Sequence, residues 1–93
     1  MYLVLIYDIQ LNDKEGTKVL RRVFKTCKKY LVHIQNSVFE GELSKSQLLM
    51  LKGELAQYLR KDRDSCIIFK ARNDIWMEKE YLTNDENKNT QFL

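Results

Sequence analysis

Six apolar or aromatic residues in succession follow the first methionine: Tyr2-Leu3-Val4-Leu5-Ile6-Tyr7. A short apolar run rich in β-branched and aromatic side chains is typical of a central strand buried on both faces, rather than of a helix. Asp8 stands at the carboxyl end of this run. We therefore expect an inner strand that ends in a carboxylate.

A helix is predicted after this strand. Asn12-Asp13 is a capping signal, and between about residues 14 and 30 apolar side chains recur at helical spacing, namely Leu20, Val23, Phe24, Cys27 and Tyr30. Residues 31–43 predict two short strands, with a turn or bulge at Asn36-Ser37 or at Gly41. Ser44 and Gln47 then form a capping box for a second helix that runs to about Arg60.

The remaining chain predicts two more strands, one at Cys66–Phe69 and a short one that begins with Ile75-Trp76-Met77. The order β-α-β-β-α-β, with this additional C-terminal strand, is that of an α+β, ferredoxin-like fold: an antiparallel sheet with two helices on one face. We expect one domain over residues 1–82 and a polar, disordered tail over residues 83–93. This fold hosts many functions, so the function must be argued from individual residues.

Composition narrows the possible classes of protein. A chain of 93 residues holds one small core, so dimerisation would be a natural way to bury more surface. With no proline and three glycines, the sequence has no phosphate-binding glycine loop, and Cys27 and Cys66 lack the spacing of a zinc or redox motif. The apolar run at the N-terminus is too short to span a membrane, and we expect a cytoplasmic protein without membrane contact.

Positive charge is concentrated in the first predicted helix. Residues 14–30 carry one acid, Glu15, and seven basic residues, which fall within about 120° of the helix circumference: Lys14, Lys18, Arg21, Arg22, Lys25, Lys28 and Lys29. A solvated helix face is one interpretation, but such faces usually mix both signs of charge. The alternative is a surface for a phosphate backbone, and we expect sequence-independent duplex binding with contacts from Lys14, Lys18, Arg21, Arg22 and Lys25.

Asp8 is the candidate metal ligand and catalytic residue. A carboxylate at the end of a strand can simply hydrogen-bond to a loop, but it can also border a binding crevice. Mg²⁺ needs only one or two protein carboxylates besides phosphate oxygens, and a dimer could supply the second. His33 is expected to take a polar outward position or a packing role rather than to act as a base, and no nucleophile triad stands out.

Three segments together resemble the CRISPR-associated protein 2 family: Leu5-Ile6-Tyr7-Asp8-Ile9, Arg21-Arg22-Val23-Phe24-Lys25 and Gln35-Asn36-Ser37-Val38-Phe39-Glu40-Gly41. The similarity extends from Met1 to about Leu82. It implies a homodimer in which the last strand, around Ile75 to Lys79, pairs with the partner's sheet. It also implies a Mg²⁺ site at the dimer interface formed by the two copies of Asp8, and phosphate-contacting or structural roles for Arg21 and Arg22.

Two functions follow from the resemblance. One is a metal-dependent endonuclease that acts on single-stranded RNA or double-stranded DNA. The other is a noncatalytic bridge between CRISPR integrase dimers during spacer acquisition, and we favour a duplex-binding bridge with nuclease chemistry that is retained or vestigial. The alternatives are a sequence-independent nucleic-acid-binding module without catalysis and, if the resemblance is accidental, a small-ligand sensor or enzyme on the same fold.

Overall fold

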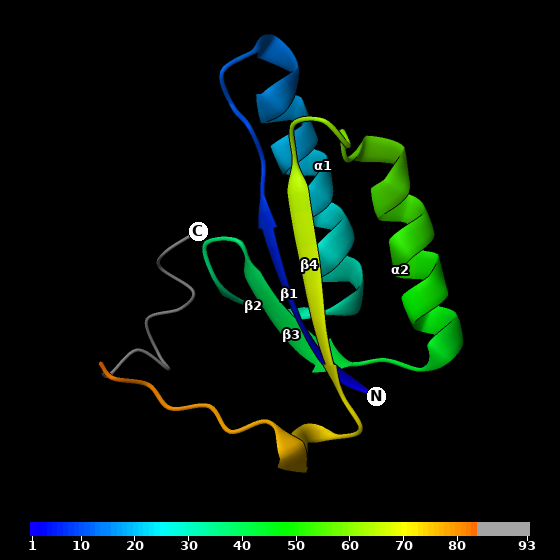
Figure 1. Cartoon of the computed structure of the whole chain (residues 1–93), viewed down its shortest axis with the longest axis vertical. Coiled ribbons are helices and arrows are strands. Elements are labelled where there is room, and N and C mark those ends of the chain that lie inside the picture. Colours follow the sequence, from blue (N-terminus) through cyan, green and yellow to red (C-terminus); the bar gives the residue numbers. More distant parts are fainter. Residues whose placement is uncertain (84–93) are drawn as a thin grey trace.

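The computed structural model describes residues 1–83, which form a four-stranded antiparallel sheet in the order β2-β3-β1-β4 with two helices on one face (Figure 1). The elements are β1 (Tyr2–Asp8), α1 (Lys14–Tyr30), β2 (Val32–Gln35), β3 (Val38–Glu42), α2 (Lys45–Tyr58), β4 (Ser65–Ala71) and the 3₁₀ helix η1 (Asp74–Trp76). The expected α+β, ferredoxin-like fold is confirmed.

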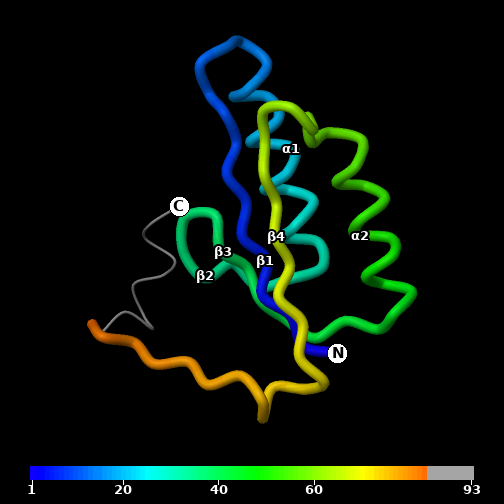
Figure 2. Tube along the Cα trace, viewed as in Figure 1, coloured from blue at the N-terminus to red at the C-terminus, as the bar shows by residue number. Residues whose placement is uncertain are grey.

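β1 is one of the two inner strands, beside β3, and its side chains alternate between the two faces of the sheet. Leu3, Leu5 and Tyr7 are buried beneath the helices, whereas Ile6 faces the other side and is partly exposed. Figure 2 shows β1 and β4 side by side along their length, in agreement with their seven-residue register from Tyr2 to Asp8. The expectation of a strand buried on both faces is wrong for the single chain, because both helices cover the same face.

Both helices begin at the predicted caps. The Asp13 side chain accepts a hydrogen bond from the Gly16 N–H at 2.8 Å, and Ser44 forms the complete capping box with Gln47. α1 buries Val23 and Cys27 against the sheet, as its apolar spacing predicts. The buried leucines of α2 complete the same core: Leu48, Leu51 and Leu55.

The turn between β2 and β3 lies at Asn36-Ser37, one of the two predicted places. Asn36 has a φ of 41°, in the left-handed region that asparagine tolerates better than most residues. The Ser37 carbonyl accepts a hydrogen bond from the Tyr7 N–H at 3.2 Å. This bond fixes the turn beside the carboxyl end of β1.

The predicted strand at Ile75-Trp76-Met77 is wrong. Asn73 accepts a hydrogen bond from the Ile75 N–H at 3.0 Å and starts the 3₁₀ helix η1. Residues 77–83 form no strand within the described part of the chain. A strand needs a neighbour for its backbone groups, and any pairing with a second copy stays a prediction.

The predicted tail, residues 83–93, lies outside the described residues except for Thr83, and the domain boundary at residue 82 stays a prediction. Within residues 1–83, neither helix is long and apolar enough to cross a bilayer. Cys27 is buried and Cys66 is partly buried, and both are free thiols. Burial raises the pKa of the Cys27 thiol to about 12, so it stays protonated at neutral pH.

Candidate nucleic-acid interface and strand-end carboxylate

The predicted nucleic-acid contacts lie together on the solvent side of α1, and we call them the basic face: Lys14, Lys18, Arg21, Arg22 and Lys25. All five side chains are exposed. Within residues 1–83, no carboxylate forms an ion pair with any of them. The positive charge of this face is therefore not neutralised inside the described chain.

Two neighbouring basic residues are engaged differently. Lys29, at the end of α1, forms an ion pair with Glu54 of α2, which raises the pKa of Lys29 and lowers the pKa of Glu54. Lys28 lies with its ammonium 5.7 Å from the centre of the Phe24 ring. Helical spacing places both within the same arc as the basic face, although neither was among the five predicted contacts.

Arg22 is the one member of the basic face for which the described structure records a ring contact. Its guanidinium lies 5.5 Å from the centre of the Tyr58 ring on α2. A cation over an aromatic ring gains a modest electrostatic attraction and still leaves its N–H groups free for other acceptors. Arg22 is thus oriented while it stays available to a phosphate.

Asp8 is the last residue of β1 and is exposed. Because side chains alternate along a strand, it points to the face of the sheet opposite Tyr7 and the helices. Its carboxylate makes no hydrogen bond or ion pair with any described residue, which argues against the interpretation of a loop-binding aspartate. A free, solvated carboxylate is a chemically suitable Mg²⁺ ligand.

The loop after Asp8 is held by a network that the sequence analysis missed. Arg60, just beyond α2, donates to both oxygens of Asp13, to Asp64 and to the Gln10 carbonyl, at 2.7–3.1 Å. The Gln10 N–H donates to Asp64 at 3.1 Å. Arg60 and Asp64 are four residues apart, but the other contacts join positions 47 to 54 residues apart, which no local spacing could reveal.

This network shifts the pKa values of its members. Hydrogen bonds from Arg60 lower the pKa of Asp64 to about 2, and they lower the pKa of Asp13 as well. The pKa of Arg60 is raised by the same partners. The side chain of Asp64 is fully buried, so its charge depends on Arg60 for compensation.

The structure does not bring Asp8 and the basic face together. α1 lies on one side of the sheet and the Asp8 side chain points to the other. Within residues 1–83, no three His, Cys, Asp or Glu side chains are grouped so that they could hold a metal ion. One chain therefore offers Mg²⁺ a single carboxylate, which fits such an ion only if substrate phosphates and another copy supply further oxygens.

Within residues 1–83, no element covers the face of the sheet that carries Asp8 in the region of β1 and β4, and we call this face the open face. Ile67 and Phe69 of β4 are 51% and 52% exposed there, beside Ile6. Nearer β2, Glu40 is buried, accepts from the Tyr2 hydroxyl and pairs with Lys79. The apolar Ile67-Ile68-Phe69 run was a signal that β4 presents apolar residues to both faces.

His33 packs, as expected. Its ring lies 5.0 Å from the Phe24 ring and 4.8 Å from the Phe39 ring, centre to centre, and its Nε2 is 2.8 Å from the Asn36 carbonyl oxygen. All three contacts are structural.

Comparison with known proteins decides the family. The family profile described as "CRISPR associated protein Cas2" matches residues 1–79. The chain belongs to the Cas2 family. The resemblance is therefore not accidental, which removes the ground for a small-ligand sensor or enzyme on the same fold.

Individual members of the Cas2 family are similar to this chain along most of its length. A "CRISPR-associated endoribonuclease Cas2" from Fusobacterium nucleatum is 55% identical over 93 residues, which are 100% of this chain and 87% of the relative. A "CRISPR-associated endonuclease Cas2" from Halalkalibacterium halodurans is 37% identical over 88% of this chain and 85% of the relative. The crystal structure of Streptococcus pyogenes Cas2 at pH 6.5 is 28% identical, with a TM-score of 0.74 over 87% of this chain and 99% of that one.

Proposed function

We propose that this Cas2-family chain acts in CRISPR adaptation as a homodimer that binds duplex DNA through α1 and bridges integrase subunits in the cytoplasm, with a Mg²⁺-dependent nuclease site at Asp8. The observation that carries the proposal is the unneutralised basic face of α1. Five exposed cations without ion-pair partners in the described chain favour contact with a polyanion. Exposed cations along one helix face can contact phosphates of any sequence, which supports backbone readout of a duplex.

The open face supports the homodimer. Ile6, Ile67 and Phe69 form an exposed apolar patch on a small domain, which is a feature of association surfaces. A two-fold axis lets the same patch cover itself in both copies. Because Asp8 points to this face, a dimer formed there would bring two carboxylates to one interface.

Asp8 of each copy would hold the ion in such a dimer. When bound, Mg²⁺ would supply Lewis-acid stabilisation for the charge on a phosphate oxygen. The chain itself contributes an exposed carboxylate and a loop fixed by Arg60 and Asp64. The printed names of the relatives from Fusobacterium and Halalkalibacterium, endoribonuclease and endonuclease, support nuclease chemistry, with single-stranded RNA as the other candidate substrate.

A noncatalytic binding protein is the second candidate function. It is favoured by the opposite placement of Asp8 and the basic face, since a duplex held on α1 of one chain does not reach the Asp8 of that chain. The exposed backbones of the edge strands β2 and β4 would then offer docking edges to an integrase subunit.

A gel assay separates the two functions. End-labelled duplex DNA and single-stranded RNA are incubated with the protein in Mg²⁺ or in EDTA, and wild type is compared with Asp8→Asn. Asp62→Asn is the matched control, because Asp62 is an exposed aspartate on the loop between α2 and β4. We expect a shifted duplex band with all three proteins, and Mg²⁺-dependent products with wild type and Asp62→Asn only.

Products that persist with Asp8→Asn would exclude Asp8 as the metal ligand. A shifted band without products from any protein would establish the binding protein and exclude the nuclease. The absence of any shift would contradict the proposed interface on α1.

A further inference from the structure

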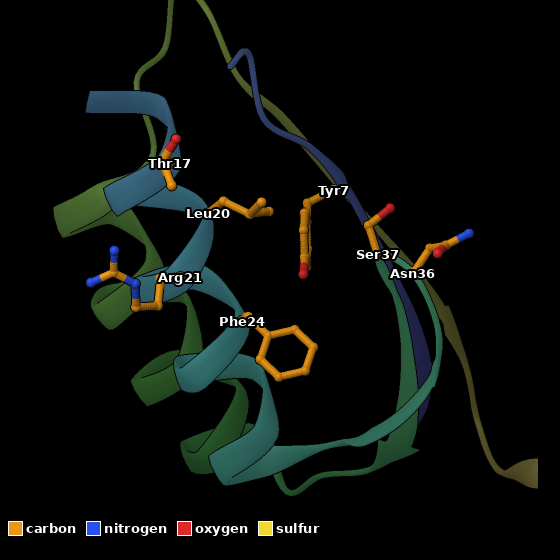
Figure 3. Close-up of a pocket in the computed structure, with 7 residues that line it drawn as sticks. All are labelled: Tyr7, Thr17, Leu20, Arg21, Phe24, Asn36 and Ser37. Carbon is orange, nitrogen blue, oxygen red and sulfur yellow. The ribbon is translucent and has the colours of Figure 1, made fainter. Parts of the chain in front are cut away.

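A cavity of about 500 Å³ lies between α1 and the β2–β3 turn, apart from the open face that carries Asp8. Its walls are Tyr7, Thr17, Leu20, Arg21, Phe24, Asn36 and Ser37, as Figure 3 shows. The volume is within the range of roughly 300–1,000 Å³ that is typical of small-molecule sites. No proposed contact of the Mg²⁺ site or of the dimer uses this space.

Tyr7 carries an unused hydrogen-bonding group inside this cavity. The residue is 3% exposed, and its ring stacks on Phe39 with the ring centres 6.0 Å apart. Its hydroxyl forms no hydrogen bond with any described residue. No buried side-chain nitrogen or oxygen of the described residues lacks a partner, so this hydroxyl is open to solvent. Burial raises the pKa of Tyr7 to about 12, so the group is a neutral donor at physiological pH.

The cavity is also bordered by the basic face. Arg21 belongs to both, and Lys18 lies one turn before it on the same helix. None of the seven lining residues is acidic. A strand whose phosphates lie along Lys18 and Arg21 would therefore pass the mouth of an apolar, partly aromatic recess.

The far wall of the cavity is already formed. Ser37 accepts from the Tyr7 N–H, and the Asn36 carbonyl lies 2.8 Å from the His33 Nε2. The Asn36 side chain is exposed at the rim, where its amide offers a donor and an acceptor. A preformed wall lowers the entropic cost of ordering a ligand.

We infer that this cavity takes one unstacked nucleobase of a single-stranded nucleic acid whose phosphates lie on the basic face. Leu20 and Phe24 would enclose the base, and the Tyr7 hydroxyl and Asn36 amide would hydrogen-bond to its edge. Single-strand binding commonly combines a basic track with aromatic side chains in this way. The inference rests on the proposed binding of nucleic acid by α1 and adds a base-dependent contribution to it.

The test compares two labelled single strands of equal length at the same salt concentration, one carrying bases and one abasic throughout. Both present the same number of phosphates to the basic face. We expect wild type to bind the base-carrying strand at least about fivefold more tightly, the effect of one stacked base. Fluorescence anisotropy gives both dissociation constants.

Two variants assign that preference to the cavity. Leu20→Trp fills the space, so the preference should fall to near unity while the affinity for the abasic strand is kept. Tyr7→Phe removes only the unpaired hydroxyl, should leave folding intact and should lower the preference roughly two- to tenfold. Tyr81→Phe, which removes a tyrosine hydroxyl outside this cavity and away from the basic face, should keep the full preference.

Equal affinity of wild type for the two strands would overturn this inference while leaving phosphate binding on α1 in place. A preference that survives both Leu20→Trp and Tyr7→Phe would also overturn it, because the bases would then be bound elsewhere. If neither strand is bound at all, the proposed interface on α1 fails together with the cavity.

Discussion

Two glycines lie in helices but differ in burial: Gly16 is buried in α1, and Gly53 is exposed in α2. A Cβ atom added to Gly16 would lie 2.3 Å from the Gln10 carbonyl oxygen, which is backbone and cannot rotate away. A Cβ atom added to Gly53, in the exposed middle of α2, would meet nothing within 4 Å. Gly16 therefore permits the close approach of α1 to the loop that follows Asp8, whereas Gly53 only weakens its helix.

We predict opposite effects on stability for the two alanine substitutions. Gly16→Ala should lower the free energy of unfolding by about 1–3 kcal/mol, because the loop must shift to make room. Gly53→Ala should raise it by about 0.5–1 kcal/mol, the usual gain of alanine over glycine in a helix. Urea denaturation followed by circular dichroism measures both changes, and equal stability of Gly16→Ala and wild type would contradict the close approach.

At the scale of elements, the network around Arg60 ties the loop after β1, the start of α1 and the segment between α2 and β4 to one another. Asp64 is its most buried carboxylate, and its pKa in the folded chain, about 2, is below the ordinary value near 4. A carboxylate with a lowered folded pKa stabilises the folded state above its ordinary pKa. This contribution is lost as the pH falls through the window from about 4 to about 2.

The pH dependence can be measured against Asp64→Asn, which keeps the shape of the side chain but not its charge. At neutral pH wild type should be clearly more stable than the variant, since a buried asparagine cannot replace the charged acceptor of Arg60. The difference in unfolding free energy should shrink as the pH is lowered from about 4 to about 2. A difference that stays constant through that range would mean that Asp64 does not carry the charge in the folded state.

Elements whose signals are local could be predicted from the sequence. The spacing of Val23 and Cys27 gave the buried side of α1, the capping residues Asp13 and Ser44 gave both helix starts, and Asn36 gave the turn. The prediction for the segment around Ile75 was wrong. Its apolar residues are typical of a strand, but Asn73 starts a 3₁₀ helix there. Local composition does not reveal whether a neighbouring strand exists.

At the scale of the whole molecule, the remaining failures concern long-range contacts. The run from Tyr2 to Tyr7 is apolar on both faces, yet the described residues, 1–83, cover only one of these faces near β4. The sequence was enough to name the residues of the basic face and Asp8. It did not reveal that they point to opposite sides of the sheet. The direction in which a side chain points and the face of the sheet that the helices cover both depend on how the elements pack. That packing is set by contacts between residues distant in the sequence.

The open face leads to a prediction about assembly. Ile67→Glu places a charge in the apolar patch and should convert the proposed dimer to a monomer, because an unpaired carboxylate is costly to bury. Leu49→Glu is the matched control, since Leu49 is 68% exposed on α2, away from the open face. Sedimentation equilibrium should give twice the chain mass for wild type and Leu49→Glu, and a dimeric Ile67→Glu would mean that another surface forms the dimer.

The central claim is that the basic face of α1 binds the phosphate backbone of duplex DNA without regard to sequence. The most direct measurement is the dependence of duplex affinity on salt concentration, for wild type and for the double variant Arg21→Ala/Arg22→Ala. Lys45→Ala/Lys52→Ala on α2 removes the same charge from exposed positions outside the basic face and is the control.

If each copy in a dimer places three or four cations on phosphates, the slope of log affinity against log salt should be about −5 to −7. The Arg21→Ala/Arg22→Ala variant should lose affinity for all duplex sequences by about the same factor, and its slope should be shallower. The control should keep the wild-type slope. A wild-type slope near zero, or an equal loss in the control, would contradict the account.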